Sequence, residues 1–187
     1  MKTLILASSS PRRKALLKQA NLTFTVLPSH MKESIAPYSS PQDAVKSLAR
    51  KKAMDIFQQH PDNVILAADT VVVFQGKILG KPADEQEAYE MLERLSGRQH
   101  DVFTGVAIVS ADAEIVFYDA TRVTFWDLER EDIERYVASG EPFDKAGAYG
   151  IQGLGAIFVK EIQGDFYNVV GLPLSRTVRQ LKSLGMA

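Results

Sequence analysis

The chain has 187 residues, with 22 basic and 23 acidic side chains, a net charge of −1 and no cysteine. That length normally makes one domain and is enough to bury a core. The missing cysteine excludes disulfides, thiol catalysis and Cys-type zinc sites, and fits a reducing cytosol. The near-neutral charge disfavours a broad nucleic-acid surface, so we expect no nucleic-acid partner. The sequence shows neither an apolar run long enough to span a membrane nor a signal-peptide pattern, so we expect a cytoplasmic protein without membrane contacts.

The chain begins with an apolar strand, residues 4–7, followed by a serine-rich turn and a helix with an unusual first turn. Ser10 is a good N-cap, and Pro11 suits the first helical position. Residues 12–14, Arg-Arg-Lys, then crowd a helix end that already favours anions. Arg13 shares a helical face with the apolar residues that follow, so it is expected to point inward, toward a phosphate or carboxylate ligand. The alternative is a solvated basic turn.

Strands and helices alternate along the rest of the chain. The expected strands are 24–27, 64–74, 77–79, 102–109, 114–118, 121–126 and 156–162. The expected helices are 11–20, 41–59, 84–97, 130–139 and 173–184. This interleaving, interrupted by hairpins, predicts an α/β (α+β) fold with a mixed twisted sheet flanked by helices. We expect a single domain over 1–187, with two lobes around a central cleft.

Asp69 is a carboxylate inside a run, residues 64–74, that is apolar on both faces of a strand. Aspartate is depleted from strands, and a buried carboxylate must be paired, hydrogen-bonded or bound to a metal. Desolvated carboxylates concentrate in active sites, which indicates a metal ligand or a general base. The alternative is a carboxylate at a strand end that accepts hydrogen bonds from local backbone N–H groups.

Lys52 is a second charge that periodicity turns inward. On the expected helix 41–59 it lies within the apolar stripe of Val45, Leu48 and Ile56. We interpret it as a cation that reaches a functional site. The alternatives are a snorkelling side chain or a structural ion pair with a core carboxylate.

Other signals are weak by themselves. Lys81 stands in a Gly-Lys-Pro segment typical of loops, and Glu33 lies in an irregular polar stretch. The serine-rich turn lacks the spaced glycines of a P-loop. The histidines at positions 30, 60 and 100 are scattered and are expected in polar surroundings, which favours neither a zinc cluster nor a His-based triad.

Inward cations, a buried acid and an anion site at a helix N-terminus occur together in this sequence. These residues are Arg12, Arg13, Lys52, Lys81 and Asp69. Cations and a metal would neutralise phosphate charge, while the carboxylate handles water or the metal. We therefore expect a polyphosphate ligand and a divalent metal.

Five ordered segments, spread over nearly the whole chain, resemble those of a known family. They are Ser8–Arg13 (SSSPRR), Ala67–Thr70 (AADT), Leu79–Pro82 (LGKP), Leu95–Gly97 (LSG) and Asp144–Gly153 (DKAGAYGIQG). They resemble the Maf family of nucleotide pyrophosphatases, in particular its branch that acts on dTTP and UTP. The resemblance implies hydrolysis of a nucleoside triphosphate to the monophosphate and pyrophosphate with Mg²⁺ or Mn²⁺. It also implies a fold similar to inosine triphosphate pyrophosphatase, and a homodimer.

The resemblance further implies roles for single residues. The residue that matches the family's proton acceptor is Asp69. The residues that match its specificity-determining positions are Arg12, Thr70 and Gln152. Phosphate binding is implied for Ser8, Arg13, Lys52 and Lys81. Metal binding is implied for Glu33 and Asp69.

Members of the family are also linked to arrest of cell division. The alternative reading is therefore a nucleotide-binding regulator of division whose hydrolysis is incidental. The buried acid disfavours pure binding, because a carboxylate near phosphates weakens affinity unless a metal or a reaction requires it.

Overall fold

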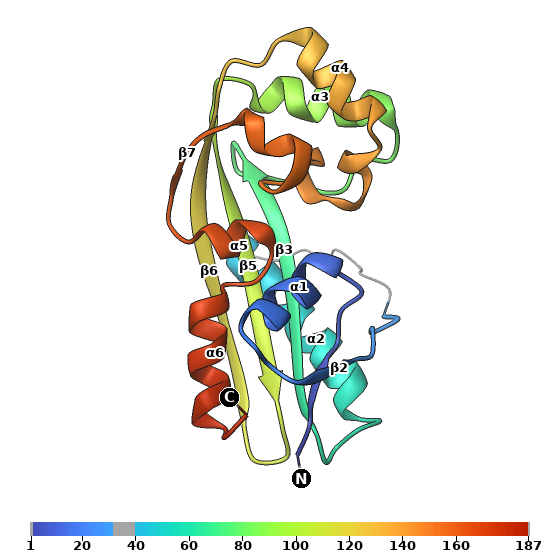
Figure 1. Ribbon diagram of the computed structural model, residues 1–187, viewed down its shortest axis with the longest axis vertical. Helices are drawn as coiled ribbons and strands as arrows, with labels where there is room; N and C mark the ends of the chain where they lie inside the picture. The colour runs from blue at the N-terminus through green and yellow to red at the C-terminus, as the bar shows by residue number, and fades with distance from the viewer. Residues whose placement is uncertain (1, 32–39, 187) are drawn as a thin grey trace. The chain divides into compact units, whose positions relative to one another are not determined.

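The computed structural model describes residues 2–31 and 40–186 and groups the chain into two compact units. Unit 1 lies within residues 1–69, 104–119 and 171–187. Unit 2 comprises Thr70–Phe103 and Ala120–Val170. The expected mixed sheet flanked by helices is confirmed (Figure 1). That a cleft separates two lobes stays a prediction.

The strands and helices alternate much as their sequence patterns predict. The strands are β1 (Leu4–Leu6), β2 (Phe24–Val26), β3 (Val64–Phe74), β4 (Lys77–Leu79), β5 (Gln99–Val109), β6 (Glu114–Phe125) and β7 (Val159–Gln163). The α-helices are α1 (Pro11–Gln19), α2 (Pro41–Phe57), α3 (Glu85–Leu95), α4 (Arg130–Ala138), α5 (Phe166–Val170) and α6 (Leu174–Ser183). Short 3₁₀ helices cover Glu141–Asp144, Ala146–Ala148 and Gly153–Phe158. No helix in the described part of the chain is long and apolar enough to cross a bilayer.

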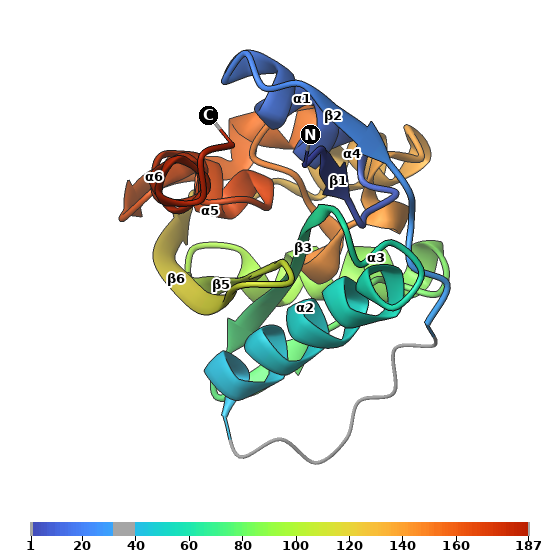
Figure 2. The same cartoon turned by 90° about the horizontal axis from the view of Figure 1, so that it is seen from below.

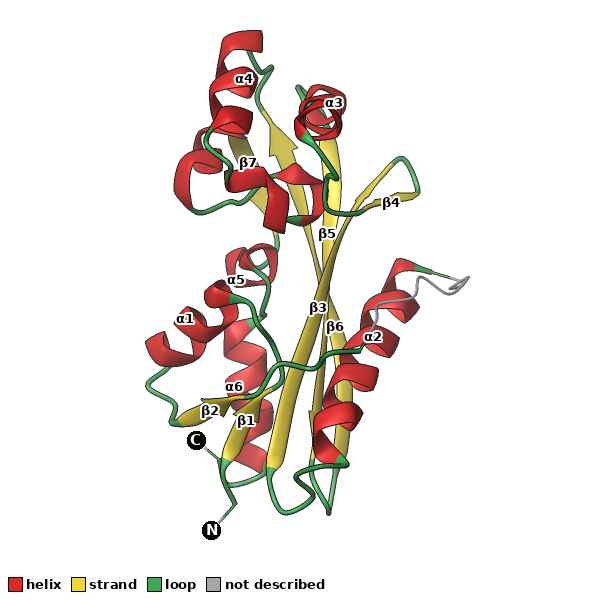
Figure 3. Ribbon diagram, turned by 90° about the vertical axis from the view of Figure 1, so that its right-hand side faces the viewer, coloured by secondary structure: helices red, strands yellow, loops and turns green. Residues whose placement is uncertain are grey.

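In unit 1 the strand order is β2–β1–β3–β5–β6, and β1 runs parallel to both of its neighbours. Helix α2 covers one face of this sheet, whereas α1 and α6 cover the other (Figure 2 and Figure 3). Ile65 and Ala67 of β3 pack against Ala49 and Ala53 of α2 in a buried core. Because side chains alternate along a strand, Asp69 belongs to this same face, the one that α2 covers.

A glycine permits the close approach of α2 to the sheet. A Cβ built at Gly105 of β5 would lie 2.3 Å from the backbone carbonyl oxygen of Val45, closer than any real contact. The helix backbone therefore rests directly on the strand at this point. This contact helps to fix where the side chains of α2 lie over β3.

Unit 2 has its own core. Here β4 pairs antiparallel with β3, and β7 pairs antiparallel with β6. Helices α3 and α4 lie side by side and pack on large apolar side chains from the strands and the 3₁₀ segments (Figure 1). Among these, Leu92, Phe125 and Phe158 are almost inaccessible.

Several expected strand boundaries are wrong. Strand β5 begins at Gln99 rather than at position 102. The segments 114–118 and 121–126 form one strand, β6, because the backbone remains extended through Asp119, whose carboxylate is held by Arg176. Strand β7 begins at Val159 rather than at position 156. The amides of Leu154 and Gly155 donate to the carboxylate of Glu141, and Gly153–Phe158 form 3₁₀ turns before the strand begins.

Candidate active site

The turn between β1 and α1 forms as its sequence predicts. Ala7 donates its backbone N–H to Leu66 of β3 at 2.8 Å, which extends the strand contact beyond β1. Ser10 caps the helix by accepting from the backbone N–H of Arg13 at 3.4 Å. Pro11 occupies the first turn, where its missing N–H leaves no bond unmade. Ser8, which is nearly buried, lies just before this helix N-terminus.

Arg13 is held inward by two hydrogen bonds within unit 1. Its Nε donates to the carbonyl oxygen of Gly171 at 2.8 Å, and its Nη1 donates to Ser8 Oγ at 3.2 Å. Lys14, by contrast, is exposed, and Arg12 is half-buried. The predicted inward orientation of Arg13 is therefore confirmed, and a solvated basic turn does not describe it. A guanidinium held beside a helix N-terminus is suited to an anion.

Lys52 and Asp69 form an ion pair between α2 and β3. Lys52 Nζ donates to Asp69 Oδ1 at 2.6 Å, and the side chains are only 15% and 11% exposed. The helical stripe and the strand alternation explain why these two side chains meet. The structural ion pair left open for Lys52 is present, and its partner is the other anomalous charge in the sequence. Both charged side chains are therefore largely shielded from solvent.

Ser8 and Asp69 lie near the point where β1 ends: Ser8 follows β1, and Asp69 lies within the longer β3. Leu6 of β1 lies opposite Leu66 of β3, so Ser8 comes two residues beyond this pair and Asp69 three. Ligands of open parallel sheets bind outside the carboxyl ends of the strands. Unit 1 thus places the Ser8–Arg13 turn and the Asp69 carboxylate near the end of β1; that the turn binds an anion stays a prediction. That Asp69, Arg13 and Lys52 line one common pocket stays a prediction.

Unit 2 carries three other residues that the sequence singles out. Thr70 is half-buried in β3, whereas Lys81 and Gln152 are exposed. The loop with Lys81 is tied to the glycine-rich segment, because Gly147 donates its backbone N–H to the carbonyl oxygen of Gly80 at 3.0 Å. Gly147 has φ +69°, and a Cβ there would lie 3.0 Å from the side chain of Val72, so a glycine is required.

His100 corrects the expectation that the histidines lie in polar surroundings. Its side chain is buried among aromatic rings, with ring centroids 4.9 Å from Phe125 and 5.3 Å from Tyr149. Its Nε2 lies 2.7 Å from the Tyr149 hydroxyl. Burial lowers the pKa of His100 to about 4 and raises that of Tyr149, so both are neutral near pH 7. The sequence signal for this burial was that His100 lies two residues before Val102 on β5, a spacing that places both side chains on the same face of the strand.

The metal expectation concerns Glu33 and Asp69. Glu33 lies outside the described residues. Within residues 2–31 and 40–186, no group of three His, Cys, Asp or Glu is placed to hold a metal ion. Asp69 nevertheless offers hard carboxylate oxygens, and it is the one buried acid among these residues. Mg²⁺ is commonly held by one or two carboxylates plus substrate phosphates, so this donor chemistry fits a cation that binds together with a triphosphate.

Comparisons with known proteins identify the family of the chain. A family model described as "Maf-like protein" matches residues 3–184. The chain is 54% identical over 186 residues to the dTTP/UTP pyrophosphatase of Bacillus cereus strain AH820, covering 100% of this chain and 97% of that protein. The dTTP/UTP pyrophosphatase of Bacillus thuringiensis subsp. konkukian gives the same identity and coverage.

A solved structure supports the fold. The structure of a HAM1 protein from Coxiella burnetii superposes with a TM-score of 0.54 at 16% sequence identity, covering 98% of this chain and 100% of that one. A likeness at this identity concerns the architecture only. The full-length match to the family model and the identity to the curated relatives decide the assignment: the chain belongs to the Maf family.

Proposed function

We propose that this protein is a nucleoside triphosphate pyrophosphatase that hydrolyses dTTP and UTP to the monophosphate and pyrophosphate. The observation that carries the proposal is the buried pair of Lys52 and Asp69; Asp69 lies on β3 three residues past the position paired with the last residue of β1, the strand that the Ser8–Arg13 turn follows. The relatives, which are 54% identical over the full chain, are named dTTP/UTP pyrophosphatases, and these names are the basis for the proposed reaction and for the thymine and uracil nucleotides as substrates.

The reaction is attack of water on the α-phosphorus. A bond forms from the water oxygen to the α-phosphorus, the bond to the α,β-bridging oxygen breaks, and pyrophosphate leaves. Asp69 orients this water and accepts its proton. Lys52, which donates to Oδ1, fixes the carboxylate so that its remaining lone pairs point in defined directions. Such positioning is the main source of catalysis in phosphoryl chemistry.

The phosphates are bound by cations that the fold holds in place. Ser8 and the carbonyl of Gly171 fix the guanidinium plane of Arg13 before substrate arrives, so little side-chain entropy is lost on binding. We assign phosphate binding also to Ser8, Lys52 and Lys81, in line with the family resemblance. Neutralising charge that develops on the leaving pyrophosphate stabilises the transition state.

Base selection is assigned to Arg12, Thr70 and Gln152. Amide and hydroxyl groups can exchange hydrogen bonds with the edge of a pyrimidine. A site that must hydrogen-bond its substrate rejects analogues strongly, because its own polar groups are otherwise left unpaired.

The divalent cation would be Mg²⁺ or Mn²⁺, and Asp69 together with Glu33 would hold it. When bound, this cation supplies Lewis-acid stabilisation of phosphate charge. We further propose that the protein works in the cytoplasm as a homodimer, without a nucleic-acid partner. Light scattering on the purified chain measures the dimer directly.

The test is a nucleotide panel with Mg²⁺ or Mn²⁺. We expect dTTP and UTP to give monophosphate and pyrophosphate, with GTP and ATP hydrolysed far more slowly. In ¹⁸O-labelled water the label should enter the monophosphate, because attack is at the α-phosphorus. Diphosphate plus orthophosphate as products would contradict the reaction. Stoichiometric binding of dTTP without released pyrophosphate would instead identify a regulator.

A further inference from the structure

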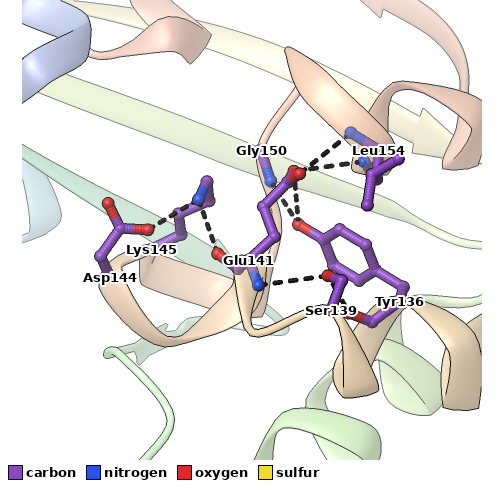
Figure 4. A network of polar contacts seen from close by, with 8 residues as sticks. Tyr136, Ser139, Glu141, Asp144, Lys145, Gly150 and Leu154 are labelled. Carbon is purple, nitrogen blue, oxygen red and sulfur yellow. Dashed lines mark hydrogen bonds and ion pairs between the residues drawn. The ribbon is translucent and has the colours of Figure 1, made fainter.

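The carboxylate of Glu141 holds the backbone that follows Gln152. Its Oε2 accepts from the N–H of Leu154 at 3.0 Å, and its Oε1 accepts from the N–H of Gly155 at 3.3 Å (Figure 4). Hydrogen bonds to a charged acceptor are stronger than neutral ones. One side chain therefore fixes the chain just after the residue assigned to base selection.

The hydroxyl of Tyr136 holds the backbone that precedes Gln152. It accepts from the N–H of Gly150 at 3.2 Å and donates to Oε1 of Glu141, also at 3.2 Å (Figure 4). Burial raises the pKa of Tyr136, so the hydroxyl stays neutral and can both donate and accept. Residues 150–154 thus form an arch whose two ends are bound to one side-chain pair, with Gln152 at its centre.

The arch is packed tightly around this pair. A Cβ built at Gly153, where φ is +71°, would lie 2.8 Å from Glu141 Oε2. A Cβ at Gly155 would lie 2.5 Å from the carbonyl oxygen of Gly150. Lys145 Nζ donates to the backbone carbonyl of Glu141 at 2.6 Å, which fixes the residue that carries the carboxylate. The backbone of the arch is thus closely packed and hydrogen-bonded, although Gln152 itself is exposed.

We propose that Tyr136 and Glu141 are positioning residues for substrate selection, which act by fixing the arch that presents Gln152. The inference rests on the proposed function, in which Gln152 reads the pyrimidine. An exposed amide can discriminate between bases only when its backbone is held, because hydrogen bonds weaken steeply with distance and angle. Neither residue is among those assigned to catalysis or phosphate binding, so the chemical step should be preserved when they change.

The main test is Tyr136→Phe, which removes the hydroxyl and keeps the ring. We expect KM for dTTP to rise about ten-fold and the preference for dTTP over GTP in kcat/KM to fall about ten-fold, with kcat for dTTP changed little. Hydrogen exchange of the Gly150 and Leu154 amides should become faster. The matched control, Tyr118→Phe in unit 1, should change none of these. A variant in which all substrates lose kcat/KM equally would overturn the inference.

A double-mutant cycle separates positioning through Gln152 from a general loss of structure. Gln152→Ala should lower the dTTP preference in the wild-type background, and lower it little further in Tyr136→Phe. Fully additive effects would contradict the inference. Should Tyr136→Phe fail to fold, Glu141→Gln takes its place, because it keeps one carbonyl acceptor and loses the charge.

The failure of this inference can be told apart from the failure of the proposed function. A wild-type protein that prefers dTTP and UTP, with variants that keep the same preference, overturns the inference alone. A wild-type protein without any pyrimidine preference overturns the proposed function and the inference with it.

Discussion

Lys52 Nζ lies 2.6 Å from Asp69 Oδ1, and both side chains are largely withdrawn from water. The desolvation of two buried charges roughly cancels their attraction, so such a pair adds little to the free energy of unfolding. Its place in the fold therefore calls for another explanation. In the proposed function, this pair keeps the Asp69 carboxylate in a fixed orientation for the hydrolysis of a phosphate.

Asp69→Asn should fold and lose at least about a thousand-fold in kcat for dTTP. The amide keeps the shape and still accepts a hydrogen bond from Lys52, but it cannot take a proton. The free energy of unfolding should fall by only about 1–3 kcal/mol, because a charged partner is lost. The rate of dTTP hydrolysis is measured from the pyrophosphate released. Asp119→Asn, which removes the same charge from the more exposed pair with Arg176, is the control and should remain active.

Arg13→Lys should raise KM for dTTP about ten-fold and affect kcat less. A lysine ammonium cannot reproduce the fork that bonds Ser8 and Gly171 together, so the cation is no longer fixed before the substrate binds. Steady-state kinetics checks this. The matched control is Arg176→Lys, an exposed arginine of the same unit that bonds Tyr118 and Asp119. An unchanged KM for Arg13→Lys would remove this residue from phosphate binding.

Gly105→Ala should lower the free energy of unfolding by about 2 kcal/mol or more. The new methyl group would meet the backbone of Val45, which cannot rotate away as a side chain could. Urea denaturation with an unchanged slope measures the loss. Gly80→Ala is the control, because a Cβ there meets nothing within 4 Å. Equal midpoints for the two variants would mean that α2 does not rest on β5 as described.

His100 should make the protein less stable as the pH falls from about 6.5 to about 4. The folded-state pKa of about 4, set by burial, lies below the ordinary 6.5, so the unfolded chain binds more protons in this window. The free energy of unfolding therefore rises with pH across it, by up to about 3 kcal/mol in total.

His100→Gln should flatten this dependence relative to wild type, as measured by thermal unfolding between pH 4 and 7.5. The exposed His30 provides the control, and His30→Gln should leave the curve parallel to that of wild type. Identical pH slopes for wild type and His100→Gln would show that His100 titrates normally.

The sequence determined much of this protein by itself. Local sequence rules predicted the capped start of α1 at Ser10, the long buried strand β3 and the inward orientation of Arg13 and Lys52. They could do so because periodicity and capping depend on residues that are close in sequence. The family motifs indicated the reaction for the same reason, since each motif is a short continuous segment.

Tertiary structure decided which groups meet. Asp69 and Lys52 are far apart in sequence, and only the packing of α2 on β3 made them one ion pair. His100 became a buried neutral base because aromatic rings from other segments enclose it. No local sequence pattern predicted that Tyr136 and Glu141 would hydrogen-bond the backbone of residues 150–155. Long-range contacts of this kind depend on the summed burial of the whole core, which no short window of sequence contains.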